Sequence, residues 1–193
     1  MVRCQINCIN KLSSYSLYRI VLPMLSQSQS SEIQKSFRKF AKIERWSAPH
    51  AITLTMKQGV LAQGSRGDPV VCLTREAASQ NYRHFLSLLS SRVLGKAAKR
   101  FGKRLNSVSV IERGGGKRLH IHAAIDCPRD DLVTMFPSII TEAWRRTQWG
   151  YSQIDIQPAA DAGWINYISK LRDKPDYATA IDWENYHNAD CRV

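Results

Sequence analysis

The spacing of hydrophobic residues switches along the chain between the two-residue period of strands and the helical period of about 3.6 residues. In the first half it predicts a helix opened by the capping box Ser31-Glu32-Ile33-Gln34 and closed at Ala48-Pro49, a strand over 51–56, a loop over 59–69, and a helix over roughly 75–101 that Gly95 can interrupt. In the second half it predicts strands over 107–112 and 117–126, a helix over 130–149, a strand over 152–157, and a helix over 161–172 that Pro175 ends.

This order of elements predicts the fold class. Strands alternate with helices, but the two middle strands are joined by a short glycine-rich connection and form a hairpin. An α+β fold with a central antiparallel sheet flanked by helices is therefore expected, rather than a doubly wound parallel sheet. At 193 residues the chain suffices for one well-buried domain. We expect an N-terminal arm over 1–31, the domain over 32–175, and a solvated acidic tail over 176–193.

The net charge of the chain limits the kinds of binding partner that we expect. The chain has 28 Lys and Arg against 16 Asp and Glu, a formal net charge of +12, which indicates a polyanionic partner such as nucleic acid or an anionic membrane surface. No stretch approaches the ~20 apolar residues that span a bilayer. The five cysteines are odd in number and form no C-x-x-C pair, so no disulfide framework is expected and the cytoplasm is the expected location.

The basic residues are concentrated in two places. No acidic residue lies between Ala77 and Ile111, and a single-sign stripe there favours contacts with DNA phosphates over an ordinary solvated face. The predicted DNA-binding residues are Arg92, Lys96, Lys99, Arg100 and Lys103 in this stripe, and Lys35, Arg38, Lys39 and Lys42 in a second cluster near the N-terminus.

A candidate metal site lies in the predicted hairpin. His120 and His122 flank Ile121, so on a strand both imidazoles project from one face. Glu112 ends the preceding strand, which the hairpin brings alongside. Two imidazoles and a carboxylate without a thiolate suit one divalent cation, Mg²⁺ or Mn²⁺. The alternatives are structural histidines, and a Glu112 that pairs with Arg113 or Lys117.

A candidate nucleophile lies in the last predicted helix. Tyr167 belongs to an apolar stripe there, and taken alone it is more typical of a core aromatic residue. Lys170 follows one turn later, where its ammonium can stabilise a phenolate or a phosphate oxygen. A free tyrosine ionises only near about pH 10, so it needs such help to act as a nucleophile.

These residues carry a family resemblance. The ordered set Ile52-Thr-Leu-Thr55, Glu112, His120-Ile-His122 and Tyr167-Ile-Ser-Lys170 resembles HUH endonucleases of the rolling-circle replication initiator type, over roughly residues 51–174. Leu171 stands where some phage-type relatives carry a second tyrosine, so the resemblance is to the type with a single catalytic tyrosine. It implies a ferredoxin-like, RRM-like palm.

The resemblance also implies an activity. Glu112, His120 and His122 would hold one divalent cation, and Tyr167, helped by Lys170, would nick single-stranded DNA at a replication origin. The products would be a 5′-phosphotyrosyl enzyme and a free 3′-hydroxyl, and the reaction would initiate rolling-circle replication of a plasmid or phage. The chain contains no G-x-x-x-x-G-K-[ST] motif, so no nucleotide cofactor is expected, and a host helicase and polymerase are the expected partners.

Two other functions remain open from the sequence. Gly114, His120, His122 and Asp126 are similar to part of a cupin metal motif, and two histidines with one carboxylate also serve iron oxygenases. Cupins, however, are nearly all-β barrels, whereas this chain is rich in predicted helix. The other alternative is a non-catalytic DNA- or RNA-binding module, such as a repressor or degenerate initiator, with tryptophans as stacking platforms.

Overall fold

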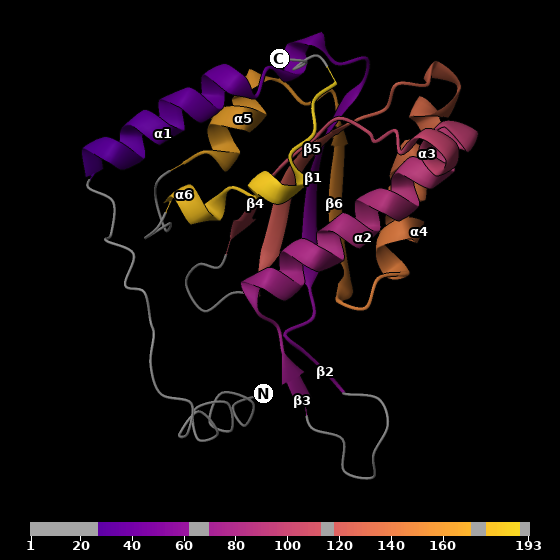
Figure 1. Ribbon diagram of the computed structural model, residues 1–193, viewed down its shortest axis with the longest axis horizontal. Coiled ribbons are helices and arrows are strands. Elements are labelled where there is room, and N and C mark those ends of the chain that lie inside the picture. The colour runs from indigo at the N-terminus through magenta and orange to yellow at the C-terminus, as the bar shows by residue number, and fades with distance from the viewer. Residues whose placement is uncertain (1–26, 62–69, 113–117, 171–176, 190–193) are drawn as a thin grey trace.

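A computed structural model describes residues 27–61, 70–112, 118–170 and 177–189 and confirms the α+β class with an antiparallel sheet flanked by helices (Figure 1). The sheet has four strands in the order β4-β5-β1-β6, and each neighbouring pair is antiparallel. These strands are β1 (Pro49–Met56), β4 (Ser107–Glu112), β5 (His120–Asp126) and β6 (Gly150–Pro158). The predicted strands therefore all form, and β4 has the predicted bounds.

Helices cover both faces of the sheet, α2, α3 and α4 on one side and α1, α5 and α6 on the other (Figure 1). Their bounds are α1 (Gln27–Phe40), α2 (Arg75–Leu94), α3 (Lys96–Phe101), α4 (Phe136–Arg145), α5 (Ala162–Ile168) and α6 (Tyr177–Ala180). Short 3-10 helices span Ile43–Arg45, Asp130–Met135 and Trp183–Asn185.

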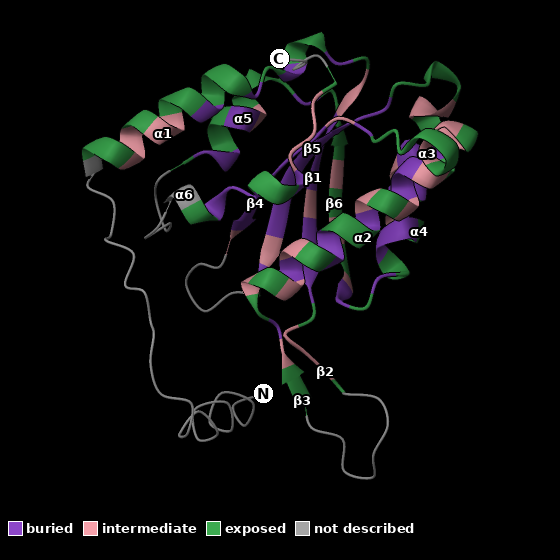
Figure 2. Ribbon diagram, viewed as in Figure 1, coloured by how far each residue is buried: buried purple, intermediate pink, exposed green. Residues whose placement is uncertain are grey.

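Strand alternation divides the hydrophobic core in two. Odd positions of β5, such as Ile121, and even positions of β1, such as Leu54, pack under Phe85 of α2 and Trp144 of α4. The opposite face is the smaller core, where Val110 of β4 packs with residues of α1, α5 and α6. In Figure 2 strands β1, β4 and β5 are mainly buried, as expected for strands covered on both sides, whereas β6 at the edge of the sheet is mainly intermediate or exposed.

The long helix predicted over 75–101 is interrupted at Gly95, as expected. Thr74 caps α2 by accepting a hydrogen bond from the Ala77 amide. Gly95 has φ 56°, a conformation that a residue with a Cβ rarely adopts, and its amide donates to the Ser91 carbonyl before α3 begins.

The predicted bounds of three helices are wrong, and two of them, α1 and α4, also end earlier than expected, at Phe40 and Arg145. α1 already includes Gln27, so Ser31 lies within the helix rather than capping it, and the expected arm boundary at residue 31 falls inside α1. The segment predicted as one helix over 130–149 starts with a 3-10 helix, and α4 takes over at Phe136, with a proline in its first turn. α5 ends at Ile168, while residues 171 and 172 lie outside the described part of the chain.

A short antiparallel ladder pairs the start of the loop predicted over 59–69 with the residues that directly follow it. β2 (Gly59–Leu61) pairs with β3 (Val70–Cys72), and residues 62–69 are not among those described.

Cys72 is disulfide-bonded, which the cysteine spacing did not predict, whereas Cys127 is a free thiol. Among the described helices, none combines the length and the apolar character needed to cross a bilayer.

The C-terminal segment packs on the domain, although the sequence predicted a solvated acidic tail. Ile181 is buried and bridges to Val110, and His187 bridges to Ser107, so residues 177–189 run along the outer edge of β4. Asp182 accepts hydrogen bonds from Ser79 of α2 and from Asn185. Burial raises the pKa of the Asp182 carboxyl, and these two hydrogen bonds oppose the rise.

The attachment of this segment should depend on pH through His187. Burial, followed by the charge of Arg104, lowers the pKa of His187 below its usual value. The unfolded state therefore binds more protons than the folded state as pH falls below about 6.5, and stability is lost over that range. We expect the thermal unfolding midpoint to fall between about pH 7.5 and 5.5, and to fall less in His187→Gln. The exposed His84 supplies the control: His84→Gln should keep the wild-type dependence, and equal dependence in all three proteins would contradict the assignment.

Candidate metal centre and nucleophile

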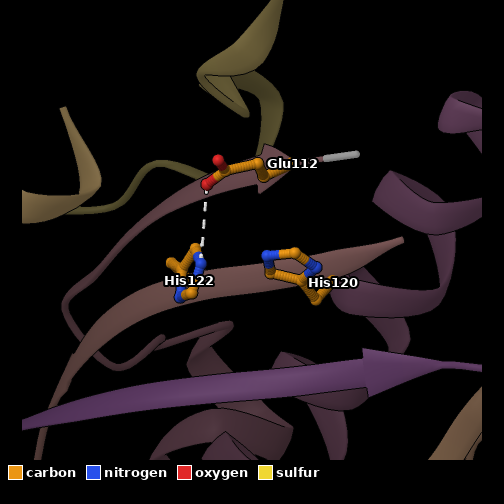
Figure 3. Close-up of side chains that lie close together, drawn as sticks. All are labelled: Glu112, His120 and His122. Atoms are coloured by element: carbon orange, nitrogen blue, oxygen red, sulfur yellow. Dashed lines mark ion pairs between the residues drawn. The ribbon is translucent and has the colours of Figure 1, made fainter. Parts of the chain in front are cut away.

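Three predicted ligands meet at one end of the β4–β5 hairpin. In the antiparallel register His120 lies opposite Glu112, and His122 lies opposite Val110. Period-two alternation puts both imidazoles on the face that carries Glu112, and all three side chains converge there (Figure 3). The Glu112 Oε2 atom is 3.5 Å from His122 Nε2, and one possible ligand atom from each residue lies within 4.8 Å of the others.

Hydrogen bonds orient both imidazoles for metal binding. His120 Nδ1 lies 2.9 Å from the Arg118 carbonyl oxygen, which can only accept, so this nitrogen carries the proton and donates. His122 Nδ1 lies 3.0 Å from Thr53 Oγ1 on β1. In each ring Nε2 is therefore the nitrogen available to a cation. A metal-bound histidine usually has its other nitrogen held in this way, which fixes ring orientation and tautomer.

The residues present fit a divalent cation. Ligand bonds of about 2.0–2.2 Å place two atoms on one ion up to about 4 Å apart, so the three donors need only a small contraction. The Glu112 carboxylate supplies the negative charge, and the described residues at the site include no thiolate. The alternative pairing of Glu112 with Arg113 or Lys117 lies outside the described residues. Among the described residues, Glu112 lies next to His122.

Helix α5 places Tyr167 against this cluster. The Asp161 carboxylate caps α5 by accepting from the Trp164 amide, and the Trp164 indole Nε1 donates to the Ala123 carbonyl of β5 at 3.0 Å. The helix is thereby fastened to the strand that carries both histidines. The Tyr167 ring lies edge-on to His122, with centroids 5.6 Å apart, and stacks on Trp164 at 5.3 Å.

Tyr167 is not a core residue. Its exposed fraction is 47%, so the phenol is accessible to a large substrate. Lys170 Nζ lies 4.5 Å from the Tyr167 ring centroid, beyond the end of α5 rather than on the same helical turn. The predicted Tyr–Lys neighbourhood is therefore present, but a turn at Ser169 produces it, not continued helix.

Helix α1 holds the end of α5. Gln34 Nε2 donates to the Ser169 carbonyl at 2.6 Å, and Arg38 Nε donates to Ser169 Oγ at 2.7 Å. Ser169 is fully buried and caps α5, so these bonds satisfy polar groups at the helix end next to Lys170. Arg38, which was predicted to bind DNA, is exposed and also bonds to Ser169 through its guanidinium.

The structure does not bring the basic stripe to the metal site. Arg92 is on α2 and the following members are on or beyond α3, so the break at Gly95 divides the stripe between two helices. Both helices lie on the opposite side of the sheet from α5. Lys103 precedes the start of β4 and Glu112 ends it, a separation of at least about 17 Å along the strand. All five residues of the stripe are exposed, as are Lys35 and Lys39 of α1 and Lys42, which follows α1.

Some site residues were not singled out from the sequence for the roles they have here. Thr53 appeared only within a strand motif, and its bond to His122 depends on the β1–β5 register, which pairs these two residues. Gln34 and Ser169 gave no signal, because a bond between residues 135 positions apart has no local pattern. Trp164 was expected in the apolar stripe, but not its hydrogen bond to β5.

No family model matches this sequence, and comparisons with curated proteins and with solved structures find no match. The site must therefore be interpreted from its own geometry.

Removing the hydroxyl of Thr53 tests whether the cluster is a metal site. Thr53→Val leaves His122 Nδ1 without its partner, and loss of such a partner typically lowers metal affinity by about 10- to 100-fold. Titration calorimetry with Mn²⁺ would measure this change. Thr55 lies on the same face of β1, opposite His120 in register, so Thr55→Val is the matched control. Equal Mn²⁺ affinity in the two variants would contradict the assigned role of Thr53.

Proposed function

We propose that this protein is a metal-dependent endonuclease that nicks and rejoins single-stranded DNA at a specific sequence through a covalent 5′-phosphotyrosine. One observation carries the proposal: an accessible tyrosine, Tyr167, is held against His122 of a two-histidine, one-carboxylate cluster. A nucleophile next to a cation site is the arrangement that phosphoryl transfer requires.

The topology supports this assignment. The elements that form the sheet and its larger core follow the order β1-α2-β4-β5-α4-β6, and the two central strands are β5 and β1. This is the connectivity of ferredoxin-like and RRM-like palms, which the resemblance to HUH replication initiators implies. An open sheet with helices on both faces is not a β-barrel, which argues against the cupin alternative.

In the proposed reaction Glu112, His120 and His122 hold one Mg²⁺ or Mn²⁺, which supplies Lewis acidity at the scissile phosphate when bound. The Tyr167 oxygen attacks phosphorus, and the bond between phosphorus and the 3′-oxygen breaks. The phenolic proton is balanced by the proton that the leaving 3′-oxygen gains, so the products are a phosphotyrosine and a 3′-hydroxyl. One phosphodiester replaces another, and the reverse reaction rejoins the strand.

Lys170 and Trp164 prepare the nucleophile. The Lys170 ammonium lies over the Tyr167 ring and adds a positive charge next to the nucleophile, which favours the approach of a negatively charged phosphate. Trp164 stacks on the same ring and is itself anchored to β5, so it restricts the position of the phenol. Such positioning lowers the entropic cost of reaching the phosphorus atom.

The proposed substrate is a replication origin of a plasmid or phage, with a host helicase and polymerase as partners. A free 3′-hydroxyl is the primer that a polymerase needs, and single-stranded DNA is the form that a helicase exposes.

A covalent adduct tests the activity. Incubation with labelled single-stranded origin-like DNA and Mn²⁺ should give a protein–DNA product that survives denaturing electrophoresis. Tyr167→Phe removes the attacking oxygen but keeps the ring packed on Trp164 and His122, so it should fold and bind DNA normally yet form no adduct. Adduct formation by Tyr167→Phe would contradict the assignment of the nucleophile.

Removal of a cation ligand should abolish cleavage but leave DNA binding intact. His120→Ala removes one ligand and should abolish adduct formation, while affinity for single-stranded DNA stays within about twofold, because phosphate contacts dominate binding. Fluorescence anisotropy with the same oligonucleotide measures the affinity. A loss of binding that parallels the loss of cleavage would contradict this separation.

A second candidate is the non-catalytic DNA- or RNA-binding module. The basic stripe favours it, because these exposed cations lie on the other side of the sheet from the metal cluster. If the wild-type protein and Tyr167→Phe bind DNA alike and neither forms an adduct under any metal, this candidate is the better one.

A further inference from the structure

A pair formed by an arginine and a tyrosine ring lies beside the metal cluster, and its side chains take no part in the chemistry described above. The Arg118 guanidinium carbon is 4.4 Å from the centroid of the Tyr151 ring. Arg118 precedes β5 and Tyr151 is on β6, so the pair spans β1, which lies between these strands. Arg118 is exposed and Tyr151 is half-buried.

This pair lies at the far end of the cluster from the nucleophile. Arg118 is two residues before His120, and its carbonyl oxygen accepts a hydrogen bond from the His120 ring. Contacts then run from His120 to His122, with ring centroids 4.7 Å apart, and from His122 to Tyr167. The cation ligands therefore lie between Tyr167 and the Arg118–Tyr151 pair.

The geometry of phosphoryl transfer determines which nucleotide of the substrate lies at each end of the metal cluster. Attacking and leaving oxygens lie roughly in line through phosphorus, so the leaving 3′-oxygen is on the side opposite the nucleophile. With Tyr167 at the His122 end, the nucleotide that leaves with the 3′-hydroxyl extends toward Arg118.

We propose that Arg118 and Tyr151 form a stacking subsite for the unpaired base of the nucleotide immediately 5′ of the scissile phosphate. This assignment rests on the proposed function. A guanidinium plane and an aromatic face are the two protein surfaces on which nucleobases stack. After cleavage the same contact keeps the 3′-hydroxyl strand in place, ready for rejoining.

The neighbouring residues favour a base over a phosphate at this position. Gln153 and Asp155, two and four residues after Tyr151 on β6, are exposed. The Asp155 carboxylate repels a phosphate but accepts hydrogen bonds from the amino group of a base, and the Gln153 amide both donates and accepts. The subsite should therefore distinguish between bases.

Binding of an oligothymidylate of about ten nucleotides in Mg²⁺ tests stacking without any need for cleavage. Tyr151→Leu keeps an apolar side chain but removes the ring, and Arg118→Lys keeps the charge but removes the plane. Each should weaken binding by about five- to a hundredfold with little change in salt dependence. Tyr151→Phe should bind like the wild type, and Gln80→Ala, at an exposed position of α2 on the other side of the sheet, is the control. Thermal unfolding establishes that each variant is folded.

Cleavage of a random-sequence pool of single-stranded oligonucleotides in Mn²⁺ tests the assigned nucleotide. Sequencing the released 3′-hydroxyl strands should show a bias at their last base that Tyr151→Leu weakens and Tyr151→Phe retains. Tyr151→Leu should also rejoin these strands at least about fivefold more slowly, because it releases them sooner.

The outcomes of the two experiments distinguish a failure of the stacking subsite from a failure of the proposed nuclease function. If the wild type does not bind oligothymidylate, or if Tyr151→Leu and Arg118→Lys bind it as the wild type does, the subsite is overturned whatever the cleavage result. If adducts form but Tyr151→Leu leaves the terminal-base bias unchanged, the assignment to this nucleotide is overturned. If the variants lose binding as expected and no adduct ever forms, stacking is supported and the proposed nuclease function fails.

Discussion

The pairing register of three adjacent strands is the constraint on which the site depends. It sets Glu112 opposite His120 on one side of β5, and Thr53 opposite His122 on the other. Strand side chains alternate between faces, so a slip of one residue in either ladder would carry a ligand or its hydrogen-bonding partner into the opposite core. That core, filled by Ile121 and its neighbours, makes the slip unfavourable because it would bury polar groups and expose apolar ones.

The nucleophile depends on a second constraint, because α5 is short. Seven residues form too few helical hydrogen bonds to be stable alone. The helix is secured at both ends and along its length: Asp161 caps its start, Trp164 bonds to β5, and Ser169 at its end is bonded by α1. Tyr167 therefore owes its position to the packing around α5 rather than to helix propensity.

Local patterns predicted what depends on local chemistry. The bounds of β4, the break at Gly95 and the shared face of His120 and His122 follow from side-chain period and from the conformation of glycine. The Thr53–His122 bond depends on strand register, and the bond from Arg38 of α1 to Ser169 depends on how the helices pack. Neither could be predicted from a local pattern. Composition was misleading at the C-terminus, where Ile181 is buried and Ser79 and Asn185 bind Asp182. The position of the basic stripe relative to the metal site could not be predicted either, because it depends on how α2 and α3 pack on the sheet.

The bond between α1 and Ser169 joins residues that are 131 positions apart, Arg38 and Ser169. During synthesis α1 emerges from the ribosome long before α5, and the histidine strand emerges between them. A growing chain can therefore assemble the cation ligands well before it can secure the tyrosine.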